Sequence, residues 1–466
     1  MRRTKIIATI GPKTESEEMM KKLCDAGMNI ARINMSHGTH QWHEMVINRL
    51  KKISKSREFP VGIMLDTQGP EIRTSTTEFG LEEGEIFKIA VSSACDIQEG
   101  EKHTFVNYEE LTKNVKKKDI IMIDNGLIAL EVIKIDPYHI TCKVLNKGDL
   151  GQRKSVTIPG IKTHLPAMTE KDVADIKLGV KNGIDFVAQS FVRKKQDLIE
   201  MRNLLSKLKS NAFLVAKIED QEGVNNMDEI IAEADGVMVA RGDLGVEIPF
   251  EEIPLVQRKI VKKCIEAGKP VIIATHLLES MIVNPRPTRA EVTDIVNAVF
   301  ERADCIMLSA ETTKGAYPIE CVETMNKIAK NTQKKFNFDL SCNRLRTDKV
   351  KEAITLGSCI NAENLGAKAI IVFSKTGKLL SNVTKWRANV DVFVFTDNEE
   401  VRKQLMIYWN AFSFTLNFSK DFDTLTNNSI KLLKDKKYLV KDDLIILVSD
   451  ISPRKNVDVM EIRKVE

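Results

Sequence analysis

Short apolar runs alternate with amphipathic helical segments over most of the first 310 residues. Two helical segments have recognisable ends: one begins at Ser16 and ends at Gly27, and the next covers residues 41–55. Apolar runs separated by helices are typical of parallel strands joined by crossover helices. Eight such runs occur, at residues 5–11, 29–35, 61–66, 186–191, 213–219, 236–240, 271–276 and 305–309. Eight βα units predict a (β/α)8 barrel, the TIM barrel.

The pattern changes between residues 70 and 159, where short segments alternate apolar with polar residues and turn sequences separate them. Such alternation predicts an antiparallel β insert, and we expect a small β-barrel that forms a lid over the end of the third barrel strand. We place this lid domain at residues 71–158, between a first barrel part at 1–70 and a second at 159–333.

A second α/β unit covers residues 334–466. Helical segments at 352–367 and 377–387 flank a strand at 369–373, and further strands are predicted at 390–396, 412–418, 444–450 and 457–463. The last two strands are close in sequence, so we expect them to pair antiparallel at a sheet edge. The predicted fold class is therefore α/β: a TIM barrel with an inserted antiparallel β-barrel lid and a C-terminal α/β domain.

Polar residues gather at the C-terminal ends of the predicted barrel strands. From the second strand on, each strand is apolar through most of its length and then turns polar, at Asn34, Ser36, Asp66, Thr67, Ser190, Lys217, Glu219, Arg241, Asp243, Thr275, His276, Ser309 and Glu311. The C-terminal ends of barrel strands meet on one face, where such barrels keep their active sites. The sequence therefore predicts one site on that face, with the insert above it.

Lys217, Glu219 and Asp243 are the sharpest candidates for chemistry, because they follow two successive strands. Two carboxylates one βα unit apart can share a hard cation, which leaves its other positions to water and to substrate phosphate. Lys217 then stands beside the metal as a fixed positive charge. The alternative interpretation of these three residues is a surface cluster of ion pairs.

Composition excludes several classes of protein. The chain of 466 residues carries 70 Lys and Arg against 65 Asp and Glu, a balance too even for a nucleic-acid surface. No apolar run approaches the length of a signal sequence or a membrane span. The eight cysteines are scattered without a CxxC pair. They are typical of reduced, buried thiols, so we expect a cytoplasmic protein without nucleic-acid or membrane partners.

Several long motifs occur in one order along the chain. They are TKIIATIGP (4–12), ARINMSHG (31–38), LDTQGPEIR (65–73), VAQSFVR (187–193), KIED (217–220), VMVARGDLGVEIP (237–249), PVIIATHLLESMIVNPRPTRAEVTD (270–294) and IMLSAETTKGAYP (306–318). In these motifs and their order, the sequence resembles the pyruvate kinase family over essentially the whole chain. The resemblance implies transfer of a phosphoryl group from phosphoenolpyruvate to ADP, giving pyruvate and ATP, as the final step of glycolysis.

The resemblance also implies a role for individual residues at the barrel mouth. Lys217 is expected to contact the phosphoryl group in transfer, and Glu219 and Asp243 to hold Mg²⁺ or Mn²⁺. Arg32 is expected to contact the substrate phosphate, although from its position alone it could instead pair with a carboxylate such as Asp66.

Further roles are implied for the substrate carboxylate, for potassium and for the nucleotide. Thr275, with the backbone of Gly242 and Asp243, is expected to hold the substrate carboxylate. The expected K⁺ ligands are Asn34, Ser36, Asp66 and Thr67, and the expected nucleotide contacts are Arg73, Lys154 and His37. Without the motif, Thr275 and Ser309 could equally be helix caps.

The chain departs from the family pattern at some positions. Gln68 stands where Lys is more usual, but Glu71 is present, and a Glu there goes with potassium dependence in the family. In the C-terminal domain, SKTGK (374–378) resembles the sugar-phosphate effector loop, which implies a phosphorylated effector at Ser374, Thr376 and Lys378. The later Gly-rich effector loop of the family is replaced by SDISPRKNVDV (449–459).

Residues 288–291, TRAE, form a capping arrangement at a helix start. This region lies at a subunit contact in the family. The family usually forms tetramers through the barrel and C-terminal domains, so the resemblance implies a homotetramer.

Two other functions compete with this interpretation. In a barrel aldolase or lyase, Lys217 could form a Schiff base, or Glu219 and Asp243 could hold Mg²⁺ for an enolate. In a degenerate kinase kept as a binding protein, we would expect one of these three residues to be lost, and all three are present.

Overall fold

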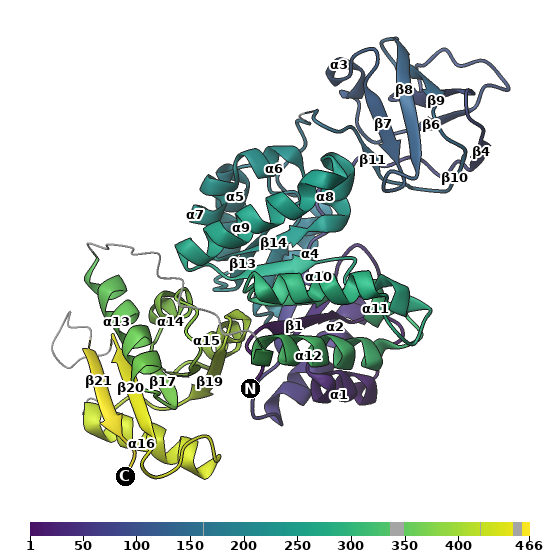
Figure 1. Cartoon of the computed structure of the whole chain (residues 1–466). Coiled ribbons are helices and arrows are strands. Elements are labelled where there is room, and N and C mark those ends of the chain that lie inside the picture. The colour runs from purple at the N-terminus through teal and green to yellow at the C-terminus, as the bar shows by residue number, and fades with distance from the viewer. Residues whose placement is uncertain (162, 336–348, 420, 451–458) are drawn as a thin grey trace.

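The chain forms three lobes in a row, with the barrel in the middle, the insert at one end and the C-terminal domain at the other (Figure 1). The computed structural model describes residues 1–161, 163–335, 349–419, 421–450 and 459–466. None of the helices within these ranges is long and apolar enough to cross a membrane.

Eight parallel strands close into a barrel in the order β1-β16-β15-β14-β13-β12-β3-β2, as predicted. The strands are β1 (Lys5–Thr9), β2 (Ile30–Asn34), β3 (Gly62–Asp66), β12 (Phe186–Gln189), β13 (Phe213–Ile218), β14 (Gly236–Ala240), β15 (Val271–Ala274) and β16 (Cys305–Leu308). Pairing of β1 with β16 completes the ring. The polar residues after each strand are thereby brought to one face of the barrel.

Helices connect the strands and cover the outside of the barrel (Figure 1). They are α1 (Glu17–Ala26), α2 (His40–Lys55), α4 (Glu170–Lys181), α5 (Lys195–Lys207), α6 (Gln221–Asn225), α7 (Met227–Glu233), α8 (Arg241–Glu247), η1 (Phe250–Glu252), α9 (Ile253–Ala267), η2 (Glu279–Ile282), α10 (Arg289–Phe300), α11 (Ala310–Thr313) and α12 (Pro318–Lys335). The predicted caps are present: Ser16 accepts a hydrogen bond from the Met19 amide, and Thr288 and Glu291 form a capping box.

Apolar side chains fill the inside of the barrel. Ile7, Met64, Phe186 and Met238 are completely buried there. This cluster continues through the N-terminal end of the barrel into the C-terminal domain, where Trp386 belongs to it. The barrel is therefore sealed at the end opposite to the polar strand ends.

The insert is mostly antiparallel, as predicted, and it forms a curled half-barrel with a sheet of six strands, β11-β7-β8-β9-β5-β6, and a separate pair, β10-β4. The β5–β6 pair is parallel. Its elements are β4 (Phe79–Leu81), β5 (Ile86–Ala90), β6 (His103–Phe105), α3 (Leu111–Asn114), β7 (Ile120–Ile123), β8 (Ile128–Ile135), β9 (His139–Val144), β10 (Gly148–Leu150) and β11 (Val156–Thr157). It has an apolar core of its own, so it is a domain joined to the barrel by two chain segments.

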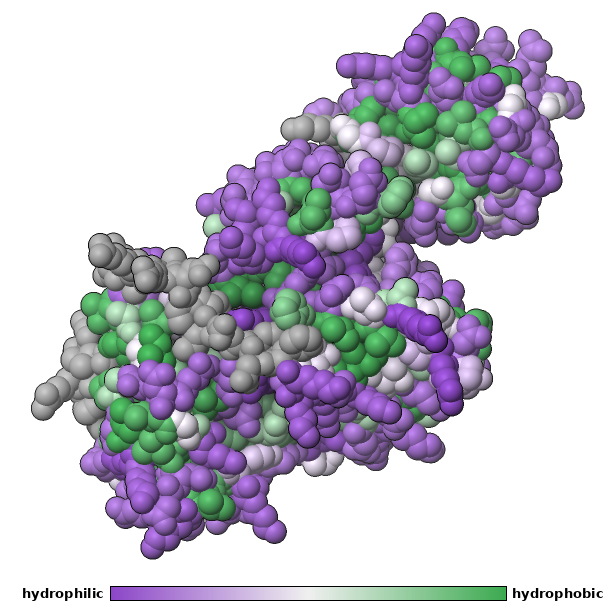
Figure 2. Space-filling view, in the orientation of Figure 1, coloured by the Kyte–Doolittle hydropathy of each residue, from purple (hydrophilic) through white to green (hydrophobic). Residues whose placement is uncertain are grey.

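Those two segments form the neck that joins the insert to the barrel (Figure 1), and the insert stands out from the barrel as a lobe of its own (Figure 2). Arg73 of the outgoing segment forms an isolated antiparallel β-bridge with Ser155 of the returning segment. The Val156 amide donates to the Ile72 carbonyl at 2.8 Å. On the barrel side, Asp172 accepts a hydrogen bond from the amide of Gly69, which has φ +77. Such a φ favours glycine, and it turns the chain out of the barrel.

The C-terminal domain contains a five-stranded sheet in the order β19-β18-β17-β20-β21. Its elements are α13 (Val350–Asn364), β17 (Ala369–Phe373), α14 (Lys378–Thr384), β18 (Asp391–Thr396), α15 (Glu399–Gln404), η3 (Leu405–Ile407), β19 (Ala411–Thr415), α16 (Phe422–Asp435), β20 (Leu444–Ser449) and β21 (Val459–Lys464). The last two strands pair antiparallel at the edge, as predicted.

Buried charges join this domain to the barrel. Arg387 donates to both carboxylate oxygens of Asp304, at 2.9 and 2.6 Å. The same carboxylate accepts a hydrogen bond from the Trp409 amide at 2.8 Å. Nearby, the buried side-chain nitrogen of Lys5 donates to the Ala411 carbonyl at 2.5 Å. The two domains are thus fastened by polar contacts as well as by the shared apolar cluster.

Candidate active site

Lys217 lies at the centre of the barrel mouth with its ammonium between two carboxylates. Its Nζ is 3.0 Å from Oδ1 of Asp66 and 3.0 Å from Oε1 of Glu219, and it donates to Oγ of Ser190 at 2.6 Å. Asp66 and Glu219 are almost completely buried. The contacts require β3, β12 and β13 to be neighbours, which is their order in the barrel. The interpretation as a surface cluster of ion pairs is therefore wrong.

The charges of this group depend on each other. Burial opposes the charged form of Lys217, but Asp66 and Glu219 outweigh that effect and raise the pKa of the ammonium above its ordinary value. Burial also opposes ionisation of Asp66, whereas Arg32 and Lys217 hold the pKa of its carboxyl below the usual value. Lysine and aspartate are thus kept as an ion pair in a region from which water is largely excluded.

Arg32 forms an ion pair with Asp66, the partner that its position in the sequence offered as an alternative to the substrate phosphate. Its Nε donates to Oδ2 of Asp66 at 2.5 Å, and its Nη1 donates to Oγ1 of Thr9 at 3.0 Å. Its Nη2 has no hydrogen-bond partner in the parts of the chain that the structure describes, and Arg32 lines a cavity. One edge of the guanidinium therefore stays available to an anion.

Glu219 and Asp243 fit a divalent cation in their chemistry. Burial raises the pKa of Glu219 and the negative charge of Asp243 acts in the same direction, while the Lys217 ammonium opposes both. The carboxylate of Asp243 makes no hydrogen bond or ion pair with any described residue, while Oε2 of Glu219 accepts the Phe191 amide at 2.7 Å. Two carboxylates that repel each other at the edge of a cleft suit a hard cation that also binds water and substrate. Among the described residues, no group of three or more His, Cys, Asp or Glu side chains is placed to hold a metal ion.

Thr275 and Gly242 lie together, as the family resemblance implies. The Gly242 amide donates to Oγ1 of Thr275 at 2.8 Å, across the ends of neighbouring strands β14 and β15. Thr275 has φ +67, an unusual conformation for a β-branched residue. Its hydroxyl caps the first turn of α8 from outside the helix, so the helix-cap interpretation and the site interpretation both describe this contact.

The four predicted potassium ligands lie at the ends of the neighbouring strands β2 and β3, and some of their oxygen atoms already accept hydrogen bonds. Asn34 and Asp66 are register partners on β2 and β3. Asn34 Oδ1 accepts the Ser36 amide at 3.1 Å, and the Thr67 carbonyl accepts Oγ of Ser190 at 2.6 Å. All four supply oxygen atoms, which suits a hard monovalent cation.

The three predicted nucleotide residues do not share a pocket. Arg73 donates to Glu71 at 2.8 and 2.5 Å, and Lys154 pairs with Asp124 at 2.8 Å, so both lid cations are satisfied by neighbours. His37 instead lines a cavity of about 840 Å³ at the barrel mouth.

Two further residues of that cavity were not singled out from the sequence, Trp42 and Lys314. Trp42 lies in the first turn of α2, five positions after His37, and its indole N–H donates to Glu15. An aromatic residue at helical spacing looks like an ordinary core residue, so only its exposure to the cavity reveals it.

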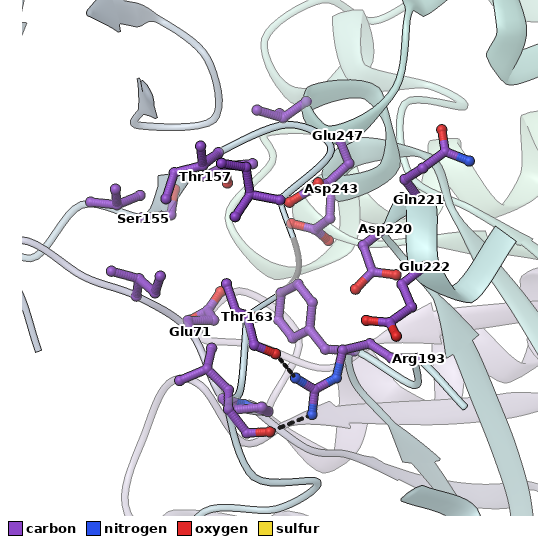
Figure 3. Close-up of a pocket in the computed structure, with 18 of the residues that line it drawn as sticks. Glu71, Ser155, Thr157, Thr163, Arg193, Asp220, Gln221, Glu222, Asp243 and Glu247 are labelled. Atoms are coloured by element: carbon purple, nitrogen blue, oxygen red, sulfur yellow. Dashed lines mark hydrogen bonds between the residues drawn. The ribbon is translucent and has the colours of Figure 1, made fainter. Parts of the chain in front are cut away.

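A second cavity, of about 120 Å³, lies where the returning neck segment meets the barrel. Figure 3 shows Glu71, Asp220, Asp243 and Glu247 around it. Arg193 donates through its guanidinium to the carbonyls of residues 163, 165 and 166 at 2.6 to 3.2 Å. These bonds fasten the returning segment to the end of β12. The role of Arg193 was not predicted from its motif.

The predicted effector residues lie on one loop after β17. Ser374 is buried, and its Oγ accepts the Gly377 amide at 3.1 Å, while Thr376 and Lys378 are exposed. Residues 451–458 of the departing segment SDISPRKNVDV lie outside the described residues. The seven cysteines within the described ranges are free thiols, and Cys342 lies outside those ranges.

The fold and this site define a TIM-barrel protein with buried cationic and acidic side chains gathered at the barrel mouth. Residues 1–322 match the family model for the pyruvate kinase barrel domain, and residues 352–463 match the model for the pyruvate kinase alpha/beta domain. The chain belongs to the pyruvate kinase family.

Individual relatives agree along the full length of the chain. It is 40% identical over 460 residues to pyruvate kinases of Staphylococcus aureus strains MRSA252 and bovine RF122, covering 97% of this chain and 78% of each relative. A crystal structure of a pyruvate kinase from Cryptosporidium parvum superposes with a TM-score of 0.92 at 35% identity, covering 100% of this chain and 96% of that one.

Proposed function

We propose that this pyruvate kinase transfers the phosphoryl group of phosphoenolpyruvate to ADP at the barrel mouth, with Lys217 as the catalytic cation. The observation that carries the proposal is the buried ammonium of Lys217, 3.0 Å from both Asp66 and Glu219. Both substrates are anions, and they repel each other unless positive charge stands between them. Phosphoryl transfer needs mostly positioning and neutralisation of charge, which a fixed lysine supplies.

The metal proposal rests on Glu219 and Asp243. These carboxylates would hold Mg²⁺ or Mn²⁺, which when bound supplies further positive charge to the phosphate and orients it. Lys217 would keep its proton throughout, because its pKa is raised by the neighbouring carboxylates. Arg32, with its free edge on the cavity, would contact the phosphate from the other side.

The substrate carboxylate is proposed to lie at the start of α8. Thr275 and the amides of Gly242 and Asp243 lie there. The Gly242 amide donates to Oγ1 of Thr275 and that hydroxyl donates to the Ala274 carbonyl, and the substrate carboxylate would replace these acceptors. Amide groups at a helix start favour an anion. This placement would direct the phosphate of the same substrate toward Lys217.

The nucleotide is proposed to occupy the larger cavity. His37, Trp42 and Lys314 line it, next to Arg32. An indole face offers a stacking surface for a base, and a lysine offers a charge for a phosphate. Arg73 and Lys154 would reach this nucleotide only when the lid turns toward the barrel, because both are paired within the lid.

Enolpyruvate must be protonated on carbon after the transfer. Oγ of Ser309 is buried and has no hydrogen-bond partner within the described chain. Both carboxylate oxygens of Glu311 already accept backbone amides, from Leu278 and Ser309. These contacts favour Ser309 over Glu311 as the group that holds the water delivering the proton.

The remaining predictions concern ions, effectors and assembly. Activation by K⁺ at Asn34, Ser36, Asp66 and Thr67, a phosphorylated effector at Ser374, Thr376 and Lys378, a homotetramer, the domain boundaries and a cytoplasmic location all stay predictions.

A coupled assay of pyruvate formation tests the proposal. We expect pyruvate only when phosphoenolpyruvate, ADP and a divalent metal are all present, with K⁺ increasing the rate. The Schiff-base alternative predicts instead that borohydride traps pyruvate on Lys217. Covalent trapping, or pyruvate formation that does not depend on ADP, would overturn the kinase assignment.

A further inference from the structure

Two consecutive residues at the end of β15 have left-handed backbone conformations. Thr275 has φ +67 and His276 has φ +53, and neither is glycine. Such conformations are unfavourable for residues with a Cβ atom, above all for a β-branched one. They persist only where surrounding contacts hold the chain in place.

Arg241 makes those contacts. Its Nη2 donates to the Thr275 carbonyl at 2.6 Å, and its Nε donates to the Ala274 carbonyl at 3.2 Å. One planar guanidinium thus binds two successive carbonyls at the point where the backbone turns. The side chain is only 10% exposed, so these hydrogen bonds meet little competition from water.

Asp294 of α10 supports the guanidinium from its other edge. Nη1 of Arg241 is 2.8 Å from each carboxylate oxygen of Asp294, and 3.4 Å from Oε1 of the buried Gln257. A guanidinium fixed at both edges has few orientations left. The carbonyls of Ala274 and Thr275 therefore meet donors at fixed positions.

Arg241 is also the residue directly before Gly242, whose amide donates to the Thr275 hydroxyl at 2.8 Å. Residues of the first turn of α8 thus donate hydrogen bonds to both the carbonyl and the hydroxyl of Thr275. We infer that Arg241, held by Asp294, is a positioning residue that keeps Thr275 and the Gly242 amide in the geometry that receives the substrate carboxylate.

This inference deepens the proposed function and rests on its placement of the substrate carboxylate. Arg241 itself does not contact the substrate. Without it, the backbone at residues 275 and 276 would relax toward negative φ and turn the Thr275 hydroxyl away from the start of α8. The variant would therefore bind phosphoenolpyruvate more weakly. The nucleotide cavity, whose lining includes neither Arg241 nor Thr275, would be unchanged.

Kinetics of Arg241→Gln test the inference. We expect the KM for phosphoenolpyruvate to rise about tenfold or more, as for the loss of hydrogen bonds from a charged donor, while the KM for ADP changes less than about twofold. Arg241→Lys should lie between, since an ammonium donates to one carbonyl but cannot span both. Asp294→Asn, which keeps an acceptor for Arg241, should show a smaller effect of the same kind and serves if Arg241→Gln does not fold.

A second substitution separates positioning from general damage. His276 is 61% exposed on its side chain and contacts Glu279 at 3.5 Å, so His276→Gly alone should change neither KM by more than about twofold. Glycine adopts positive φ without penalty. In the Arg241→Gln background, His276→Gly should therefore recover part of the lost affinity for phosphoenolpyruvate.

The outcomes distinguish this inference from the proposed site. An unchanged KM for phosphoenolpyruvate in Arg241→Gln, or equal rises for both substrates that His276→Gly does not relieve, overturns the inference. Thr275→Val removes the hydroxyl and keeps the shape. If Thr275→Val raises the KM and Arg241→Gln does not, the carboxylate site stands and the role of Arg241 is wrong. If neither raises it, the carboxylate site itself is misplaced.

Discussion

The ammonium of Lys217 and the carboxylate of Asp66 form a buried ion pair with an N–O distance of 3.0 Å, between strands that are not adjacent in sequence. We expect Lys217→Met to lower kcat by roughly a thousandfold or more, about 4 kcal/mol at the transition state, with a smaller change in KM. The reason is that the charge acts on the phosphoryl group in transfer rather than on substrate binding. Steady-state assays of pyruvate formation measure both parameters.

A control is needed because the substitution leaves Asp66 with Arg32 as its only ion-pair partner among the described residues. Lys147→Met removes a lysine that is 75% exposed and pairs with Glu82, which is 66% exposed, and we expect less than about a threefold change in kcat, because an exposed ion pair contributes little. A Lys217→Met variant with near wild-type kcat would refute the catalytic role.

Potassium dependence can be tested directly. Because Glu71 is present and Asn34, Ser36, Asp66 and Thr67 supply oxygen ligands, we expect K⁺ to increase the rate at constant ionic strength, compared with Na⁺ or Tris. Ser36→Ala should raise the K⁺ concentration needed for half-activation and leave the saturated rate largely intact. Equal rates in all three salts would remove the potassium site from the mechanism.

Most of the architecture was predictable, because the strand runs and the polar residues that end them are local signals. The closed barrel required only that eight such runs occur in order. How far the insert closes on itself was not predictable, since alternation along Ile128–Ile135 is the same in a closed barrel and in a half-barrel.

The active site likewise contains features that the sequence predicts and features that it does not. The positions of Lys217, Glu219 and Asp243 follow from strand ends, but the pairing of Arg73 with Glu71, two positions away, depends on the local conformation of the neck segment. The hydrogen bond from Arg241 to the Thr275 carbonyl depends on backbone angles that no sequence pattern predicts.

The ion pair between Arg387 and Asp304 predicts a large effect on stability. Arg387→Leu leaves the Asp304 carboxylate buried without its cation, which typically costs about 3 to 5 kcal/mol of the free energy of unfolding. We expect a lower Tm and separate unfolding transitions for the barrel and the C-terminal domain in calorimetry. Lys22→Ala, in a pair whose side chains are 54% and 76% exposed, should leave Tm nearly unchanged. Similar effects of the two substitutions would contradict the prediction.

Lys5 predicts a pH dependence of stability. Burial, and the nearby charge of Arg2, lower the pKa of its amine from 10.5 to about 7 in the folded chain. The unfolded chain binds this proton more tightly, so the free energy of unfolding should rise between pH 7 and 10.5. The buried amine costs at most about 4 kcal/mol at neutral pH, partly offset by its hydrogen bond to Ala411.

Thermal unfolding of Lys5→Met across this pH range measures the effect. We expect a higher Tm than wild type at pH 7, and a weaker rise of Tm toward alkaline pH. Lys262→Met, at a side chain that is 78% exposed, serves as the control and should follow the wild-type curve. A Lys5→Met curve parallel to wild type would show that the amine titrates near its ordinary pKa.

The insertion of the lid between β3 and β12 has a consequence for biosynthesis. Ile63 and Asp185 are joined by a hydrogen bond although they are 122 positions apart. While the ribosome makes the intervening residues, the edge of β3 has no partner and is exposed to aggregation. A lid that folds as soon as it emerges brings its two ends together at Arg73 and Ser155, which shortens the effective loop that β12 must close. Early folding of the lid would thus help β12 to pair with β3 and shorten the time for which the edge of β3 is exposed to aggregation.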